Sequence, residues 1–182
     1  CRECNACIPV RIPVERFRPD RGQRRIWKRN RDLSVIARPP LHSAKHFDLY
    51  KRYQAARHPG GGMDDPDPKK YINFLASQQI HSVFYEIRLQ KKLLGVAITD
   101  ILPDGLSAVY TFFDPDETRR SLGAYAVLWQ VAQAAERHLP WLYLGYWIKE
   151  CSKMVYKGNY RPLEIFHNGH WIQQDSHIGS RP

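Results

Sequence analysis

The chain has 182 residues, of which 43% are hydrophobic and 12% aromatic, so it is long enough and apolar enough for a packed domain. Its formal charge is +10, and residues 1–31 hold ten Lys and Arg against three acids, which leaves a local balance of +7. This composition excludes a membrane-spanning chain and favours an acidic macromolecular partner. No signal-peptide pattern is present, so we expect a cytoplasmic protein with no membrane partner.

Three cysteines, Cys1, Cys4 and Cys7, stand at three-residue intervals at the start of the chain. Thiols at this spacing can converge on zinc or an iron–sulfur cluster, and a closed zinc site needs one further ligand. The alternative is a set of reduced cysteines without metal, since nothing indicates secretion. The chain begins without a methionine, from which we expect that a segment precedes it.

A basic segment follows a short extended one. Residues 8–14 read as a strand whose prolines predict a place at the edge or rim of a sheet. Arginines and Lys28 then alternate with Phe17 and Trp27, and cations of this kind bind phosphates while aromatic rings stack on unpaired bases. The segment therefore predicts contact with nucleic acid through Arg24, Arg25, Lys28 and Arg29. A solvated basic helix is the alternative.

The linker Arg38-Pro39-Pro40 suggests two units, the end of an N-terminal cysteine-containing basic domain at residues 1–38 and a second domain at residues 39–182. Apolar spacing predicts a helix over residues 44–57. A loop rich in glycine and proline follows at residues 57–68, where His58 is a candidate general base, and then a short helix at residues 69–77. Residues 82–89, 93–100 and 106–113 predict three strands, whose short connections make antiparallel hairpins.

The stretch from residue 106 to residue 147 predicts a strand, a turn, a long helix from residue 122 to about residue 138, and a buried strand at residues 141–147. Arg119, Arg120, Ser121 and Gly123 stand where the helix begins, and its first N–H groups have no partner within the helix. This arrangement predicts an anion site, with an ordinary crossover as the alternative. Another helix is expected at residues 149–157, and Asn168-Gly169 predicts a type I′ hairpin between residues 163–167 and 170–173.

This order of elements resembles the GNAT acyltransferase fold, an α/β (α+β) fold with a central mixed, mostly antiparallel sheet. Arg120-Ser-Leu-Gly-Ala-Tyr125 is similar to the pyrophosphate turn of that fold except at Tyr125, which stands in place of a small residue. The resemblance implies that Tyr156, in a tyrosine-containing turn, protonates the leaving group.

Longer strings resemble one narrower family, the aminoacyl-tRNA–protein transferases of the N-degron pathway. They span most of the chain in order: Cys1-Arg-Glu-Cys-Asn-Ala-Cys-Ile-Pro-Val-Arg-Ile12, Arg57-His-Pro-Gly-Gly-Gly-Met63, Gly105-Leu-Ser-Ala-Val-Tyr-Thr-Phe-Phe-Asp-Pro115, Arg120-Ser-Leu-Gly123, Leu144-Gly-Tyr-Trp-Ile148, Lys153-Met-Val-Tyr-Lys157 and Arg161-Pro-Leu-Glu164. The chain is most similar to the compact bacterial branch that transfers leucine. In this family a further cysteine precedes the position of Cys1.

The resemblance implies that the α-amine of an N-terminal Asp or Glu attacks the ester of aminoacyl-tRNA, with leucyl-tRNA as the expected donor. Transfer requires no cofactor, and we expect a monomer. Glu86 is the candidate base, with a cross-strand ion pair as its alternative, and Tyr110 and Asp100 line the same site or its walls. Arg120, Ser121 and Gly123 are expected to hold the charged 3′ end. Fixed cations are needed for the acceptor carboxylate, and the candidates are Arg57, Arg88, Lys153 and Lys157.

Three other functions stay open. An arginyl-tRNA–protein transferase would need an acid at the base of its donor pocket, which Asp100 or Glu150 provides. A CoA-dependent N-acetyltransferase would use the same helix start but requires a small residue at Tyr125. A non-catalytic RNA-binding module would explain the basic segment and would leave the strand carboxylates without a role.

Overall fold

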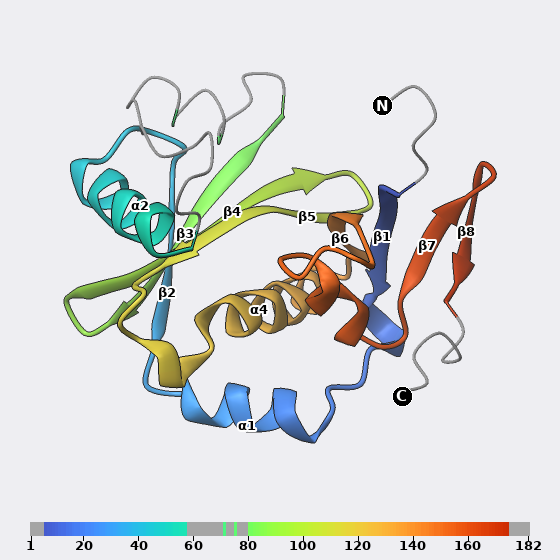
Figure 1. Cartoon of the computed structure of the whole chain (residues 1–182), viewed down its shortest axis with the longest axis horizontal. Coiled ribbons are helices and arrows are strands. Elements are labelled where there is room, and N and C mark those ends of the chain that lie inside the picture. Colours follow the sequence, from blue (N-terminus) through green and yellow to red (C-terminus); the bar gives the residue numbers. More distant parts are fainter. Residues whose placement is uncertain (1–5, 58–70, 72–74, 76–79, 175–182) are drawn as a thin grey trace.

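The structure, a computed structural model, describes residues 6–57, 71, 75 and 80–174. One sheet of eight strands forms its centre, in the order β2-β3-β4-β5-β6-β1-β7-β8 (Figure 1). The strands are β1 (Ile8–Pro13), β2 (Ser34–Arg38), β3 (Ser82–Leu89), β4 (Lys92–Leu102), β5 (Gly105–Phe113), β6 (Trp141–Trp147), β7 (Glu164–His167) and β8 (His170–Gln173). β5 and β6 run parallel, whereas the other neighbours are antiparallel. The predicted mixed, mostly antiparallel sheet is confirmed.

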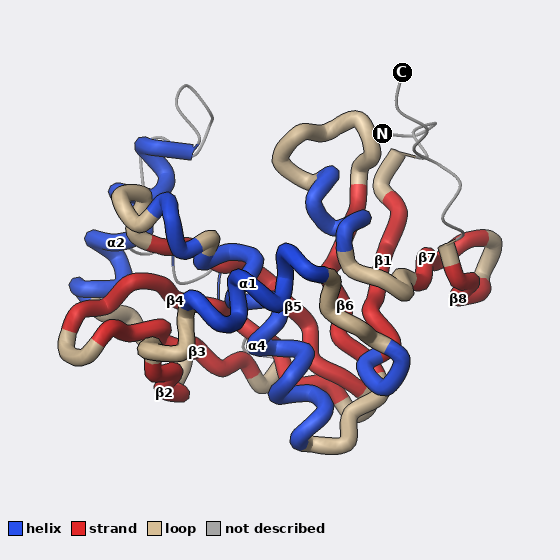
Figure 2. The backbone as a smooth tube through the Cα atoms, turned by 90° about the horizontal axis from the view of Figure 1, so that it is seen from below, coloured by secondary structure: helices blue, strands red, loops and turns tan. Residues whose placement is uncertain are grey.

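Helices cover both faces of the sheet. Alternate residues of a strand point to opposite faces: Phe84 of β3 packs with α2 (Ala44–Arg57), whereas the next residue, Tyr85, packs with α4 (Leu122–Glu136). α1 (Arg21–Arg29) lies outside α4, so α4 is enclosed between the sheet and α1 (Figures 1 and 2). The sheet therefore separates an α2 face from an α1–α4 face.

The start of α1 is fixed by its own sequence. The side chain of Asp20 accepts a hydrogen bond from the backbone N–H of Gln23, and the side chain of Gln23 accepts one from the N–H of Asp20. This reciprocal capping satisfies two N–H groups at the helix start. Further along, Trp27 packs on Tyr125 of α4 with ring centroids 5.8 Å apart, which fixes α1 against α4.

Two sequence-based expectations are wrong. β1 is an interior strand between β6 and β7; its prolines are accommodated because β7 pairs with it only at Val10 and Arg11. Residues 149–157 do not form an α-helix but turns that lead into the 3₁₀ helix η3 (Val155–Asn159). Val155 and Tyr156 are 49% and 42% exposed, so this segment has no buried apolar face to stabilise a helix.

The other elements agree with the sequence. The helix at residues 44–57, the three-stranded meander, the central helix and the last hairpin are confirmed, and Asn168 and Gly169 both have the positive φ of a type I′ turn. The glycine-rich loop with His58 and the tail after residue 174 lie outside the described residues. Of the predicted short helix at residues 69–77, the structure describes Tyr71 and Leu75, which are helical and buried.

The unit boundary at residue 38 stays a prediction, although the sheet includes strands from both sides of it. None of the helices in the described ranges has the length and apolar character needed to cross a bilayer.

Candidate functional site

The parallel strands β5 and β6 separate partway along their length. They pair only from Gly105 to Ser107 and from Trp141 to Tyr143. Beyond these pairs lie residues 108–113 of β5 and 144–147 of β6, which we call the fork. Val109 and Tyr146 in the fork are 39% and 59% exposed. In the fork, the backbone N–H and C=O groups of β5 and β6 form no hydrogen-bonded pairs with each other. An extended substrate can therefore form hydrogen bonds with these groups.

Position 145 shapes the fork on the side of β6. Gly145 has a φ of +71°, a left-handed conformation that other residues rarely adopt. Close to it, the Nζ of Lys157 donates a hydrogen bond of 2.6 Å to the carbonyl oxygen of Tyr146. Burial lowers the pKa of Lys157. The η3 segment is thereby held against the open end of β6, with Lys157 as a cation at the fork.

Tyrosine side chains lie between α2 and the fork. The Oη of Tyr110 accepts a hydrogen bond of 3.0 Å from the side chain of Gln54, and the ring of Tyr110 lies 6.4 Å from that of Tyr53. Burial raises the pKa of Tyr110, and the neighbouring Tyr53 and Tyr50 raise it further. Burial and then the charge of Tyr53 also raise the pKa of Tyr156. These phenols therefore stay protonated at neutral pH, where they can donate hydrogen bonds.

Glu86 lies at the centre of a buried ion cluster. Its carboxylate is 2.7 Å from the Nε2 of His46 and accepts hydrogen bonds from Arg88 (2.8 Å) and Arg38 (3.3 Å). Burial alone would raise the pKa of Glu86, but the hydrogen bonds from Arg88, His46 and Arg38 outweigh it and lower the pKa to about 2. These contacts favour the ion-pair alternative over the role of base.

His46 was not predicted from the sequence. It is 3% exposed, lies on α2 and faces Glu86 across the helix–sheet interface. A lone histidine in a helix gives no signal of its partner, because the partner is forty residues away in β3. Only the folded arrangement brings these two groups together.

The start of α4 holds Arg120 in a network of its own. The guanidinium of Arg120 forms two hydrogen bonds of 2.9 Å with the carboxylate of Asp32, and Glu117 lies 3.5 Å away. The hydrogen bonds that Arg120 donates to Asp32 raise the pKa of Arg120. Ser121 has a φ of 52° and makes no side-chain cap, so the first N–H groups of α4 receive no side-chain partner from it. Gly123 follows in the first turn, where an added Cβ would lie 3.2 Å from the ring of Phe113.

The cations of α1 belong to the described cations that form no ion pair with an acid. Ion pairs with acids are formed by Arg11, Arg16, Arg38, Lys51, Arg52, Arg88, Lys92 and Arg120. Within the part of the chain that the structure describes, none of the predicted contacts Arg24, Arg25, Lys28 and Arg29 has such a partner, and all four are exposed. An exposed row of cations without acidic partners favours an anionic ligand.

The acceptor candidates lie in different places. Arg57 is exposed at the end of α2 and hydrogen-bonds with Tyr53. Arg88 is engaged by Glu86 and by the carbonyl oxygen of Lys91, which leaves little of it for a ligand. Lys153 is exposed in the turns before η3. Asp100 accepts a hydrogen bond of 2.5 Å from Ser82. Arg57 and Lys157 are therefore the cations that fit an acceptor site best.

The predicted metal site cannot be assembled from the described residues. Cys1 and Cys4 lie outside them, and Cys7 is exposed. Among the residues described, no group of three potential metal ligands is found. The metal site stays a prediction.

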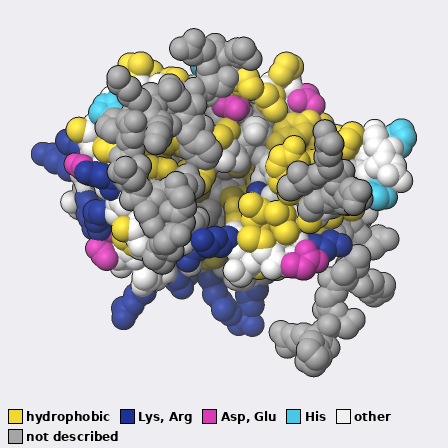
Figure 3. Space-filling view, turned by 45° about the horizontal axis from the view of Figure 1, so that its top comes forward, with side chains coloured by type: hydrophobic (Ala, Val, Ile, Leu, Met, Phe, Trp, Pro, Cys, Tyr) yellow, Lys and Arg dark blue, Asp and Glu magenta, His cyan; other side chains and the backbone are white. Residues whose placement is uncertain are grey.

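Hydrophobic side chains are exposed in the middle of the face seen in Figure 3, with lysine and arginine side chains next to them. The exposed large hydrophobic residues include Val109, Tyr146, Val155 and Tyr156, all from the fork or η3. The fork therefore combines apolar surface with Lys157 and with the tyrosine hydroxyls, a composition that suits binding of a small apolar acyl group.

Comparison with known proteins identifies relatives over almost the whole chain. Residues 45–167 match the family described as "Arginine-tRNA-protein transferase, C terminus". The chain is 53% identical over 172 residues to the aspartate/glutamate leucyltransferase of Pseudomonas syringae pv. syringae (strain B728a), covering 94% of this chain and 73% of the relative. The enzyme of the same name from Pseudomonas fluorescens (strain Pf0-1) is 54% identical with the same coverage.

Solved structures support the fold. The C-terminal domain (DUF2156) of a putative lysylphosphatidylglycerol synthetase from Agrobacterium fabrum matches with a TM-score of 0.55 at 13% identity, over 79% of this chain. L-PGS from Bacillus licheniformis matches with a TM-score of 0.53 at 11% identity, over 78% of this chain. The chain spans about half the length of each, 47%. Because the sequence identity is so low, these two matches show a shared fold and nothing about activity.

Proposed function

Because the chain belongs to the arginine-tRNA-protein transferase family, beside the bacterial aspartate/glutamate leucyltransferases, we propose that it transfers leucine from leucyl-tRNA to the α-amine of a protein N-terminal Asp or Glu. The product is an N-degron that directs the protein to degradation. The observation that carries the proposal is the 53% identity to leucyltransferases over 94% of the chain. The donor tRNA and the acceptor protein are the two partners that this reaction requires.

The reaction needs no cofactor, because the ester of aminoacyl-tRNA is already activated. The amine nitrogen attacks the ester carbonyl, a peptide bond forms, and the bond to the ribose oxygen breaks. The amine loses a proton, and the departing ribose oxygen gains one. Positioning of the two substrates and stabilisation of the developing oxyanion therefore dominate the rate enhancement.

The two faces of the sheet suit the two substrates. On the α1–α4 face, the cations of α1 and the start of α4 with Arg120, Ser121 and Gly123 bind the tRNA. Arg57, at the end of α2, and Lys157, at the fork, bind the acceptor carboxylate. This division is supported by the exposed cations of α1 without acidic partners and by the position of Lys157 next to Tyr146. The aminoacyl ester then lies in the fork, between the two faces.

Tyr156 donates the proton to the departing ribose oxygen. Its phenol is protonated at neutral pH, as that of a tyrosine with an ordinary pKa is, and Tyr156 lies beside Lys157 in η3. Tyr110 is held by Gln54 and forms part of the wall. Glu86, the base expected from the sequence, is held ionised by hydrogen bonds from Arg88, His46 and Arg38, so we assign it to the structure of the α2 interface rather than to proton transfer.

The experiment that tests the class of reaction offers the full-length protein two donors in parallel. A peptide beginning with Asp is incubated with leucyl-tRNA or with acetyl-CoA, and the products are identified by mass spectrometry. A mass increase of one leucine residue with the tRNA donor supports the proposal. Acetylation of the peptide, or no product with either donor, contradicts it.

A further inference from the structure

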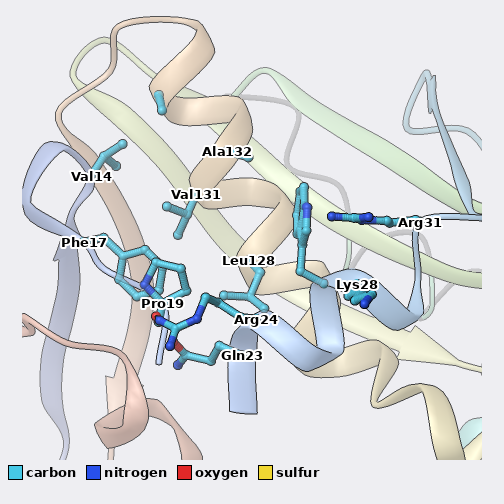
Figure 4. Close-up of a pocket in the computed structure, with 12 residues that line it drawn as sticks. Val14, Phe17, Pro19, Gln23, Arg24, Lys28, Arg31, Leu128, Val131 and Ala132 are labelled. Carbon is cyan, nitrogen blue, oxygen red and sulfur yellow. The ribbon is translucent and has the colours of Figure 1, made fainter. Parts of the chain in front are cut away.

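A hollow lies between α1 and α4, on the face of the sheet opposite α2, with a volume of about 550 Å³. The residues that line it are Val14, Phe17, Pro19, Gln23, Arg24, Trp27, Lys28, Arg31, Leu128, Val131, Ala132 and Ala135. Figure 4 shows that Leu128, Val131 and Ala132 project from α4, whereas Arg24 and Lys28 come from α1. The hollow is thus apolar inside and cationic along one edge.

The cations at this edge are available to a ligand. Arg24, Lys28 and Arg31 are exposed, and none of them forms an ion pair with an acid in the described part of the chain. Arg24 donates one hydrogen bond to the carbonyl oxygen of Pro19, which holds its guanidinium beside the hollow. Three adjacent cations around an apolar hollow complement a ligand that is anionic outside and flat or apolar inside.

Trp27 provides the flat surface. Its side chain lines this hollow and also a second one beside Tyr125 and Trp129, so the indole forms the wall between the two. Trp27 is 38% exposed, and Tyr125 supports it at 5.8 Å between ring centroids. An exposed indole that is held in place by a second ring is a suitable platform on which a nucleobase can stack.

The hollow is close to the start of α4. The side chain of Asn30, after the end of α1, donates a hydrogen bond of 2.8 Å to the carbonyl oxygen of Arg120. Leu128 in the hollow is six residues along α4 from Leu122, a distance of roughly 9 Å at the rise of an α-helix. A single nucleic acid strand whose 3′ end lies at the fork can therefore reach the hollow within a short length.

We propose that this hollow binds an unpaired nucleotide of the aminoacyl-tRNA, with its base on Trp27 and the flanking phosphates on Arg24, Lys28 and Arg31. This inference rests on the proposed function and adds a binding subsite to it. The charge pattern favours RNA over an acidic peptide, because the cations continue along α1 beyond the hollow, through Arg21, Arg25 and Arg29, as a polyanion requires.

The test measures binding of two RNA probes to the full-length protein: an acceptor-stem minihelix with an unpaired 3′ tail, and the same duplex with blunt ends. Trp27→Ala should weaken binding of the tailed probe between roughly fivefold and a hundredfold, the range found for loss of one stacked base. It should leave the blunt duplex nearly unchanged. Trp27→Phe keeps a ring and should retain most of the affinity.

Leu41→Ala is the matched control, because Leu41 is also a large exposed hydrophobic residue, at 65%, but lies away from the hollow. It should bind both probes as the parent does. Equal losses on both probes, or no loss with Trp27→Ala, would overturn the proposal. The proposal would also be overturned if Trp27→Ala lost the binding of an acidic peptide but kept the binding of RNA.

A second measurement identifies the contact directly. The tailed probe carries 4-thiouridine in its unpaired segment, and ultraviolet crosslinks are mapped by peptide mass spectrometry. Crosslinks to residues 21–31 support the subsite, whereas crosslinks confined to other segments contradict it. The proposed function fails in a different way: the parent protein would then transfer no leucine from leucyl-tRNA, whatever its crosslinks.

Discussion

At the scale of single residues, Tyr156 has the clearest chemical assignment. Its phenol carries a proton at neutral pH, and the upward shift of its pKa, caused by burial and by the neighbouring Tyr53, does not change that. Tyr156→Phe removes the hydroxyl that donates the proton and keeps the ring. kcat for leucine transfer should therefore fall by roughly a hundredfold, the lower end of the range of rate losses when a general acid is removed. Steady-state kinetics with both substrates varied measures this.

Tyr110→Phe is the comparison for Tyr156, because it also removes one phenolic hydroxyl from the same cluster. It loses the hydrogen bond from Gln54, which is worth about 1 kcal/mol of stability, and should change kcat much less. If the two variants lose the same activity, Tyr156 has no special role in proton transfer.

Glu86 gives a prediction about stability and pH. Its pKa is lowered to about 2 from an ordinary value of 4.5, since hydrogen bonds from its cations outweigh burial. The stability that this provides is fully present above pH 4.5 and is lost as pH falls toward 2. Glu86→Gln should reduce the free energy of unfolding at pH 7 by about 3 kcal/mol, because it leaves the largely buried Arg88 without its counter-ion.

Urea unfolding at pH 7 and at pH 3 measures the effect, which should be smaller at the lower pH. At pH 7 and without urea, where the variant is still folded, Glu86→Gln should retain most of the kcat for leucine transfer. A variant that is as stable as the parent but has lost transfer activity would restore Glu86 as the catalytic base and contradict the structural assignment.

At the scale of elements, the sequence predicted those whose signals are local. The helix at residues 44–57 and the hairpin at Asn168-Gly169 follow from apolar spacing and turn chemistry. The interior place of β1 did not follow, because it depends on pairing with β6 and β7, far away along the chain. Residues 149–157 were predicted as a helix, but contacts outside the segment, such as Lys157 with Tyr146, hold them in tight turns.

In the candidate site, too, features with a local sequence signal were predicted and features that depend on long-range contacts were not. The cations of α1 and the turn at Arg120 were predicted as binding residues from the sequence, because residue type and local spacing suggest their chemistry, and these roles stay predictions. The partners Asp32 and His46 were not, because they come from other elements and have no motif. Long-range contacts of this kind decide which candidate residues are available to a ligand.

The start of α4 gives an element-scale prediction. In the proposed role of Arg120, which is to hold the charged 3′ end, Arg120→Ala should raise KM for leucyl-tRNA more than KM for the acceptor peptide. Asp32→Asn is the matched control: it weakens the ion pair but keeps the cation. We expect KM for leucyl-tRNA to stay the same or fall in Asp32→Asn. A rise similar to that of Arg120→Ala would show that Arg120 acts by fixing Asp32 and not by binding tRNA.

At the scale of the whole molecule, the positive charge is uneven along the chain, with a balance of +7 in residues 1–31. The formal charge is +10, and the cations of α1 are exposed without acidic partners among the described residues. Reversing Arg24, Arg25, Lys28 and Arg29 to Glu should weaken tRNA binding and make its dependence on salt less steep. Filter binding of tRNA between low and physiological salt measures both quantities.

A matched control reverses four cations elsewhere on the protein, Lys45, Lys51, Lys91 and Lys149, with the same change in net charge. This variant should lose less affinity and keep a steeper salt dependence than the α1 variant. If both variants behave alike, tRNA responds to the total charge of the protein and α1 is not its binding face.

The most direct test of the account is a matrix of donors and acceptors given to the full-length protein. Leucyl-, phenylalanyl- and arginyl-tRNA are each offered with peptides that begin with Asp, Glu, Asn or Lys, and the products are read by mass spectrometry. The account predicts transfer from leucyl-tRNA to Asp and Glu peptides, with little to Asn or Lys. Transfer of arginine but not leucine, or transfer to Lys as readily as to Asp, would contradict it.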